Sequence, residues 1–294
     1  MTEPVRTVDD TARWVAHHRA VESARPDALF RDPLAARLAG ATGRAIAECA
    51  EPASAGGDAW YLVTRTVLLD DAVRRAVAEG CTRVVNLGAG LDTRPYRMDL
   101  PVGLDWVEVD LPGIVAEKEA LLAGETPRCR IRRIPLDLTD SGALAALLAE
   151  HSGRTLVLSE GLIMYLSPAE ADALAAVLRE AGVDRWALDL SAAGVGALVA
   201  ERNRGVLRRA PWRFLPADGA AHFEDRGWAA TRIDPVFPAA VRLGRLDTPE
   251  AHRLAAGPQP DPRAPGDVPW SAVVTYAPRP AGASATPSSA AAPR

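Results

Sequence analysis

Cysteine and lysine are scarce in this sequence, and each scarcity excludes a class of site. The 294 residues include three cysteines, Cys49, Cys81 and Cys129, which share no CxxC spacing and leave an odd count. Reduced thiols in the cytosol fit this pattern better than a disulfide framework or a zinc site, so no metal is expected. Lys118 is the only lysine, and the net charge of −4 leaves no basic excess to neutralise phosphates, which argues against a nucleic-acid partner.

Long apolar runs are also missing. No run approaches the roughly 18 residues of a membrane-spanning helix, and the first ten residues, MTEPVRTVDD, are polar and acidic, unlike a signal peptide. We therefore expect a cytoplasmic protein with no membrane partner. Hydrophobic residues make up 48% of the chain, which is enough for a sizeable core, whereas nothing in the sequence indicates an oligomeric state.

Short apolar runs alternate with helical patterns from residue 83 onward. The runs that predict strands are Arg83–Leu87, Asp105–Val109, Arg130–Ile134, Thr155–Ser159, Arg185–Leu190, Trp228–Ile233 and Trp270–Tyr276. Helical segments lie between most of the first five, at Pro112–Ala123, Gly142–Glu150 and Pro168–Ala181. This alternation predicts an α/β fold with a doubly wound, mostly parallel sheet of seven strands.

The regions before and after this alternation differ from it in composition. Residues 1–58 predict a helical N-terminal cap that ends in a loop over Ala47–Ala59, and a further helix is expected from Trp60 to Gly80. Residues 192–267 are rich first in small residues and then in Arg and Trp. We expect them to form an insertion on the substrate side of the domain, together with the last strands of the sheet. We therefore expect one domain over residues 1–277, followed by a low-complexity, disordered tail at 278–294.

A glycine pair follows the first predicted strand, in VVNLGAGLDTRPYR. Gly88 and Gly90 would lie at the carboxyl end of the sheet, where doubly wound folds bind ligands and glycine allows backbone to approach them. Tight turns also use glycine, so the pair alone is weak evidence. Asp92 stands near the third glycine of the dinucleotide fingerprint, and its carboxylate would repel a pyrophosphate. The pattern favours S-adenosyl-L-methionine over NAD.

Acidic residues close the next two strands. Asp110 follows Gly90 by 20 residues and can accept hydrogen bonds from ribose hydroxyls. Asp137 can accept from an adenine amino group while the Leu138 backbone donates to the ring. Each acid has an alternative interpretation as a helix N-cap. Suitable groups at three successive strand ends favour a nucleoside ligand.

These motifs resemble the leucine carboxyl methyltransferase family. The resemblance rests on NLGAGLDTRPYR, EVDLPGIVAEK, DLTD and SEGLIMYLSPAEA, with TARWVAHHRAVESARPDALFRDPLA and YLVTRTVLLDD in the N-terminal region. The similarity is greatest to the bacterial branch, which includes polyketide O-methyltransferases. It covers roughly residues 7 to 190 and implies a class I, Rossmann-like methyltransferase.

The resemblance also implies roles for individual residues. Arg19 and Arg65 would reach the methionine carboxylate of S-adenosyl-L-methionine, and Glu160 would face its amino-acid or sulfonium region. Gly88 would supply the close backbone approach. For three residues the resemblance implies the same roles as the strand-end argument above. Asp110 would bind the ribose, and Asp137 with Leu138 would bind the adenine.

The acceptor is the least constrained part of the prediction. Arg94 and Asp92 are expected to form an internal ion pair, whereas Tyr165 and His222 are the candidate catalytic side chains. A carboxylate needs no general base, so methyl ester formation on a small molecule, plausibly in secondary metabolism, is favoured. The alternatives are a hydroxyl acceptor of the polyketide or sugar kind, a nicotinamide-dependent oxidoreductase, and a non-catalytic nucleoside-binding module.

Overall fold

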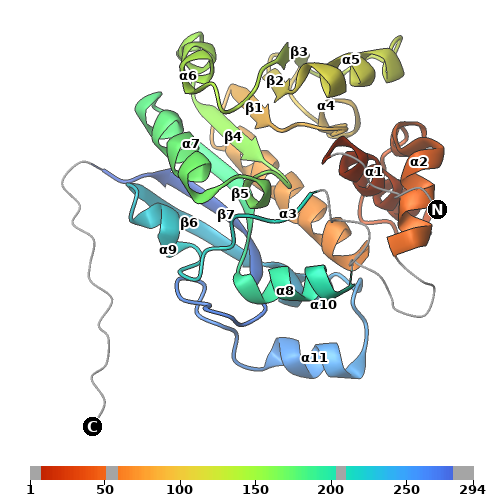
Figure 1. Cartoon of the computed structure of the whole chain (residues 1–294). Coiled ribbons are helices and arrows are strands. Elements are labelled where there is room, and N and C mark those ends of the chain that lie inside the picture. Colours follow the sequence, from red (N-terminus) through yellow and green to blue (C-terminus); the bar gives the residue numbers. More distant parts are fainter. Residues whose placement is uncertain (1–7, 51–58, 203–209, 281–294) are drawn as a thin grey trace.

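The computed structural model describes residues 8–50, 59–202 and 210–280, which form an α/β fold around a seven-stranded sheet (Figure 1). The strands are β1 (Arg83–Leu87), β2 (Asp105–Asp110), β3 (Arg130–Pro135), β4 (Thr155–Ser159), β5 (Arg185–Ser191), β6 (Trp228–Pro235) and β7 (Ser271–Pro278). Their order is β3-β2-β1-β4-β5-β7-β6, with β7 antiparallel to both of its neighbours and the other pairings parallel. The prediction of a doubly wound, mostly parallel sheet is confirmed.

Helices precede, connect and follow the strands. They are α1 (Val8–Ala24), α2 (Ala35–Ala50), α3 (Ala59–Ala78), α4 (Arg94–Arg97), α5 (Pro112–Leu121), α6 (Ser141–Ala149), α7 (Pro168–Glu180), α8 (Ala193–Arg202), α9 (Ala221–Glu224), α10 (Val236–Arg242) and α11 (Pro249–Ala256). In Figure 1, α1 and α2 lie together at one side of the sheet, and α8, α10 and α11 lie together below it. Among the described residues, no helix is both long and apolar enough to span a membrane.

The two faces of the sheet carry separate cores because side chains alternate along each strand. Val85 and Leu87 pack with the apolar faces of α6 and α7, whereas Val84 of the same strand packs with α3 and α10. Trp186 on β5 is fully buried on the α7 side, with its ring centroid 4.7 Å from that of Phe223 and 5.4 Å from that of Trp228. Helices on both faces leave the carboxyl edge of the parallel strands open for a ligand.

Several boundaries differ from the sequence prediction. α2 continues to Ala50 through the start of the predicted loop, bending at Gly40, where φ is 57°. α8, α10 and α11 occupy the stretch for which no helix was predicted. α8 contains two glycines, α10 contains a proline, and α11 is only eight residues long. β7 extends to Pro278, the first residue of the predicted tail. Residues 281–294, like 1–7 and 51–58 of the predicted cap, lie outside the described residues.

Replacing Trp186 tests the core on the α7 side of the sheet. Trp186→Ala removes a fully buried indole that packs on three aromatic rings, so the free energy of unfolding should fall by about 3–5 kcal/mol. Urea unfolding followed by circular dichroism measures this loss. Val102→Ala, at a side chain that is 81% exposed, should change stability by less than about 0.5 kcal/mol. Equal losses in the two variants would contradict the described packing.

Candidate functional site

A cavity of about 870 Å³ opens at the carboxyl edge of the sheet, within the size range of small-molecule sites. The first four strands contribute to it through the residues that follow them, and α1 and α3 contribute their inward faces. All the predicted cofactor-binding residues line this cavity, namely Arg19, Arg65, Gly88, Gly90, Asp110, Asp137, Leu138 and Glu160. Tyr165 lines it as well. The topology therefore gathers side chains that are up to about 140 residues apart in the sequence.

The glycine loop after β1 has a backbone that suits only glycine. Gly88 has φ 63° and Gly90 has φ 45°, both in the left-handed region that side chains disfavour. A Cβ at Gly88 would lie 3.1 Å from Leu162 Cδ1, and a Cβ at Gly90 would lie 3.3 Å from Ala12 Cβ. Glycine at these positions lets the loop lie close to Leu162 and Ala12, and both glycines line the cavity.

The acids at the ends of β2 and β3 are not helix caps. The Asp110 carboxylate accepts hydrogen bonds from the backbone N–H of Gly90 at 2.6 Å and of Leu111 at 2.8 Å, which joins β2 to the glycine loop. Asp137 accepts from both the backbone and the hydroxyl of Thr139, and these bonds lower its pKa. The caps of α5 and α6 are instead Leu111 and Asp140. The N-cap interpretation is wrong for both acids, and both line the cavity.

Arg94 is the centre of a buried ion-pair chain beneath the cavity. Its guanidinium contacts Asp70 on α3 at 2.7 Å, Asp92 in the glycine loop at 2.8 Å and Glu160 after β4 at 2.7 Å. Asp70 also pairs with Arg97. The predicted Arg94–Asp92 ion pair is confirmed. Because Arg94 neutralises Asp92, repulsion between that carboxylate and a pyrophosphate is weaker than the sequence argument assumed.

Arg65 continues the chain toward β5. Its guanidinium lies 3.1 Å from Glu160 and 3.1 Å from Asp189, and the side chain is 6% exposed. Asp189 also accepts a hydrogen bond from the backbone N–H of Gly161, whose φ is 62°. Sequence analysis missed Asp189, although an acid inside the otherwise apolar strand WALDL was a usable signal.

The pKa values in this chain follow from burial and from the arginines. Burial alone would raise the pKa of Asp70, Asp92 and Glu160, but the neighbouring guanidiniums outweigh it and lower all three pKa values. At Asp189 burial prevails and the pKa is raised. The charged residues that line the cavity are the carboxylates of Asp92, Asp110, Asp137 and Glu160 and the guanidiniums of Arg19 and Arg65. Carboxylates on the wall favour a ligand that carries positive charge.

Arg19 fastens α1 to the glycine loop. Its guanidinium donates to the Asp32 carboxylate at 2.9 Å and to the Leu91 backbone oxygen at 2.6 Å, and Asp32 in turn accepts from the Thr93 hydroxyl. Arg19 and Arg65 both line the cavity while paired with buried carboxylates. A ligand carboxylate would therefore meet guanidiniums whose positions are already fixed.

His222 does not line the cavity, which corrects its assignment as a catalytic candidate. It lies on α9 with Nε2 2.9 Å from an Asp172 oxygen on α7 and its ring edge-on to Phe214 and Phe223. Its ring is thus held among α7 and α9 side chains. Two cavity-lining residues outside the prediction, Tyr61 and Ser271, are hydrogen-bonded to each other at 3.1 Å.

Comparison with known proteins decides the family. The sequence model of the leucine carboxyl methyltransferase family matches residues 12–179, more than half of the chain. The chain belongs to the leucine carboxyl methyltransferase family. It is 35% identical to a Frankia alni protein over 87% of this chain and 96% of that protein, and 37% identical to a Mycobacteroides abscessus protein over 85% and 92%. Both relatives are named for S-adenosyl-L-methionine-dependent methyl transfer.

Solved structures support the fold. A methyltransferase structure from Thermobifida fusca matches with a TM-score of 0.60 and 15% identity over 94% of this chain and 96% of that one. A structure from Streptomyces avermitilis matches with a TM-score of 0.57 and 16% identity over 92% and 97%. Together with the family match, these findings identify a class I S-adenosyl-L-methionine-dependent methyltransferase, and they favour this prediction over the nicotinamide-dependent alternative.

The cavity fits this cofactor. Gly88 and Gly90 line it without side chains, the strand-end acids can accept hydrogen bonds from ribose and adenine, and the carboxylates on its wall complement an ammonium and a sulfonium. The contribution of the ion-pair chain to stability can be measured separately. It bears on the site because the chain holds the loops that would contact the cofactor.

Removing the charge of Arg94 should destabilise the protein. Arg94→Gln leaves Asp70, Asp92 and Glu160 buried with fewer cationic partners, so unfolding at pH 7 should cost about 3–5 kcal/mol less than in the wild type. Those carboxylates then have raised pKa values and become protonated at higher pH. The stability difference should therefore narrow as the pH falls toward about 4, near their unfolded pKa values.

Chemical denaturation of both proteins between about pH 4 and 7 measures this dependence. Arg74→Gln is the matched control, because Arg74 pairs with Asp71 while more than half exposed and should contribute at most about 1 kcal/mol. A stability difference for Arg94→Gln that is as small as the control, or that does not change with pH, would contradict the described network.

Proposed function

We propose that the protein transfers a methyl group to a carboxylate oxygen of a small molecule, giving a methyl ester. The observation that carries the proposal is the chemistry of the cavity wall. Among the described lining residues there is no histidine, and the central carboxylate, Glu160, is already paired with Arg65 and Arg94. Of the other carboxylates on the wall, Asp92 is paired with Arg94, and Asp110 and Asp137 are assigned to the cofactor, so none is left as a base for a hydroxyl proton. A carboxylate acceptor needs no base.

In this proposal the cofactor spans the strand ends. Asp110 accepts hydrogen bonds from the ribose hydroxyls, while Asp137 and Leu138 hold the adenine at the edge of β3. Arg19 and Arg65 bind the carboxylate of the amino-acid end, and Glu160 faces its positive charge. Gly88 and Gly90 allow the backbone approach. When bound, S-adenosyl-L-methionine supplies an electrophilic methyl group on a positively charged sulfur.

Tyr165 is the candidate for positioning the acceptor. It lines the cavity after β4, and burial raises the pKa of its phenol, so the hydroxyl stays protonated at neutral pH. A protonated hydroxyl donates a hydrogen bond to an acceptor oxygen and fixes its direction of attack. It is not suited to act as a base.

The apolar part of the cavity wall also favours methyl transfer, because it excludes water from the acceptor. Trp60, Phe237 and Val195 belong to a part of the cavity that is lined mainly by carbon atoms. Closing this part over an acceptor removes water from the carboxylate, whose charge disappears when the ester forms. An acceptor with an apolar body therefore gains both binding and reactivity. The resemblance to enzymes of polyketide metabolism supports a natural-product acceptor.

A product assay tests the acceptor chemistry. Candidate acids and alcohols are incubated with radiolabelled cofactor and enzyme, and the product is then treated with mild alkali. A methyl ester should release labelled methanol, whereas a methyl ether would survive. Alkali-stable product from alcohols, with none from acids, would replace the carboxylate by a hydroxyl acceptor.

The pH profile is a separate prediction. Because a carboxylate acceptor is ionised above about pH 5 and no base is required, kcat/KM should be nearly constant from about pH 6 to 9. Steady-state rates in buffers of matched ionic strength measure it. A limb that rises tenfold per pH unit in this range would reveal an essential deprotonation and would contradict the base-free mechanism.

Asp110→Asn tests the cofactor position. The amide oxygen can still accept from the Gly90 N–H, whereas the amide nitrogen cannot accept from the Leu111 N–H. The loss of the charged acceptor should weaken S-adenosyl-L-methionine binding about ten- to a hundredfold. Calorimetric titration measures the affinity, and thermal unfolding checks that the variant is folded. Asp99→Asn, an exposed aspartate, is the control and should bind like the wild type. Unchanged affinity in Asp110→Asn would remove Asp110 from the cofactor site.

A further inference from the structure

The cavity extends beyond Arg65 into a second half that the predicted cofactor residues do not line. This acceptor half is formed by the first turn of α3, by α8, by α10 and α11, and by the segment that leads into β7. Its lining residues are mostly aromatic, aliphatic or proline: Trp60, Tyr61, Val195, Trp212, Val236, Phe237, Leu254, Pro258, Pro260, Val268 and Pro269. Most of them lie outside residues 12–179, the part of the chain that the family model matches.

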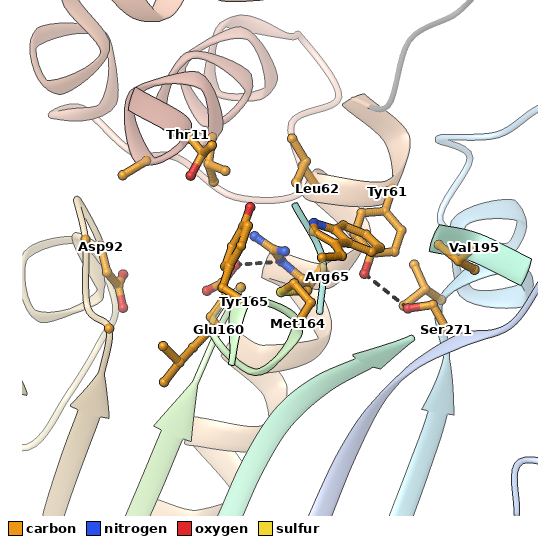
Figure 2. Close-up of a pocket in the computed structure, with 18 of the residues that line it drawn as sticks. Thr11, Tyr61, Leu62, Arg65, Asp92, Glu160, Met164, Tyr165, Val195 and Ser271 are labelled. Carbon is orange, nitrogen blue, oxygen red and sulfur yellow. Dashed lines mark hydrogen bonds and ion pairs between the residues drawn. The ribbon is translucent and has the colours of Figure 1, made fainter. Parts of the chain in front are cut away.

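Three hydroxyl groups meet in this apolar surrounding. Tyr61 Oη lies 3.1 Å from Ser271 Oγ and 3.5 Å from Ser191 Oγ, and the two serine oxygens are 3.1 Å apart. Ser191 ends β5 and Ser271 begins the antiparallel β7, where they are partners in register. Figure 2 shows Tyr61 and Ser271 with Val195 on one side of the cavity. Strand pairing and the first turn of α3 thus assemble a hydroxyl cluster at one point.

The hydroxyl groups of this cluster can form hydrogen bonds with a ligand in the cavity. Tyr61 and Ser271 line the cavity, whereas Ser191 is 2% exposed and lies behind them. The Tyr61–Ser191 contact, at 3.5 Å, is at the limit of a hydrogen bond, so the phenol can turn outward while it still accepts from Ser271. Burial raises the pKa of Tyr61, which keeps its proton available for donation.

The surrounding wall defines the shape of what can bind. The Trp60 ring lies edge-on to Tyr61 at 5.9 Å and to Phe237 at 6.3 Å, which presents flat aromatic surfaces. At the rim, Leu254 and Val268 line the cavity and are 59% and 51% exposed. In an otherwise apolar pocket, a few convergent polar groups set the orientation of the ligand.

We propose that the cluster of Tyr61, Ser191 and Ser271 binds a hydroxyl or carbonyl oxygen on the flat, apolar body of the methyl acceptor. This inference rests on the proposed function and deepens it: the acceptor is an oxygen-substituted aromatic or polycyclic molecule. Its apolar body lies against Trp60 and Phe237, and its substituent selects one orientation in which the nucleophilic oxygen faces Tyr165.

Matched probes test the cluster without knowledge of the natural acceptor. 2-Naphthol and naphthalene share a flat apolar body and differ by one hydroxyl. Each is titrated into the full chain, with and without saturating S-adenosylhomocysteine, and binding is followed by tryptophan fluorescence. The wild type should bind 2-naphthol about five- to tenfold more tightly than naphthalene, the gain expected from one or two neutral hydrogen bonds.

Single-atom variants assign this preference to the cluster. In Tyr61→Phe and Ser271→Ala the preference for 2-naphthol should fall below about twofold, while naphthalene affinity stays within twofold of the wild type. Tyr96→Phe is the matched control, because the Tyr96 hydroxyl bonds to Arg133 away from the cavity and its removal should leave the preference intact.

Each contrary outcome overturns the inference. Equal binding of the two probes, binding of neither, or a preference that survives in both variants would show that the cluster does not select the ligand. A merely structural brace would lower the thermal stability of the variants and weaken both probes alike. Failure to bind S-adenosylhomocysteine would instead contradict the proposed function, and the titrations without it keep the two failures distinguishable.

Discussion

The guanidinium of Arg94 holds together three parts of the molecule that the chain itself keeps apart. Through Asp70 it contacts α3, through Asp92 the glycine loop after β1, and through Glu160 the segment after β4. Breaking such buried pairs costs far more than breaking exposed ones, because it leaves Asp92 without its guanidinium partner, and Asp70 and Glu160 with one guanidinium each, away from water. The position of the glycine loop relative to β4, and with it the shape of the cavity, depends on this side chain.

The cavity combines two environments that suit the two partners of a methyl transfer. Acids at the strand ends and Glu160 lie on the side proposed for the cofactor, where they would complement its positive charge. Aromatic and aliphatic side chains from α3, α8, α10 and α11 lie on the other side. Tyr165 belongs to the lining between β4 and α7. An acceptor held in the apolar half reacts with little water present, so alignment and exclusion account for most of the proposed catalysis.

Much of the fold follows from local patterns in the sequence. The strand around Val85 and its parallel partners end within two residues of their predicted limits, because buried parallel strands are short apolar runs bounded by turn residues. α8 and α11 were not predictable in this way. α8 is rich in glycine and alanine, and α11 is only eight residues long and mostly exposed, so neither carries a long apolar stripe. Gly40 likewise interrupts α2 with a kink that the composition of the chain does not reveal.

The site was predictable where function is tied to a strand end and unpredictable where it depends on tertiary contacts. Gly88, Asp110 and Asp137 lie within two residues of the ends of their strands, so the topology alone brings them together. His222 was a candidate because it is a histidine in an unassigned segment, but packing turns it toward Asp172. The Tyr61–Ser271 pair spans 210 residues, and it forms only because α3 packs against β7, which is paired with β5.

The central claim is that one cavity holds the cofactor over the strand ends and leaves its apolar half for the acceptor. A crystal structure of the protein with S-adenosylhomocysteine tests it most directly. The account predicts the ribose within hydrogen-bond distance of Asp110, the adenine beside Leu138, and the sulfur facing Tyr165 and the half lined by Trp60 and Phe237. An adenosyl group seated in that apolar half, away from Asp110, would contradict it.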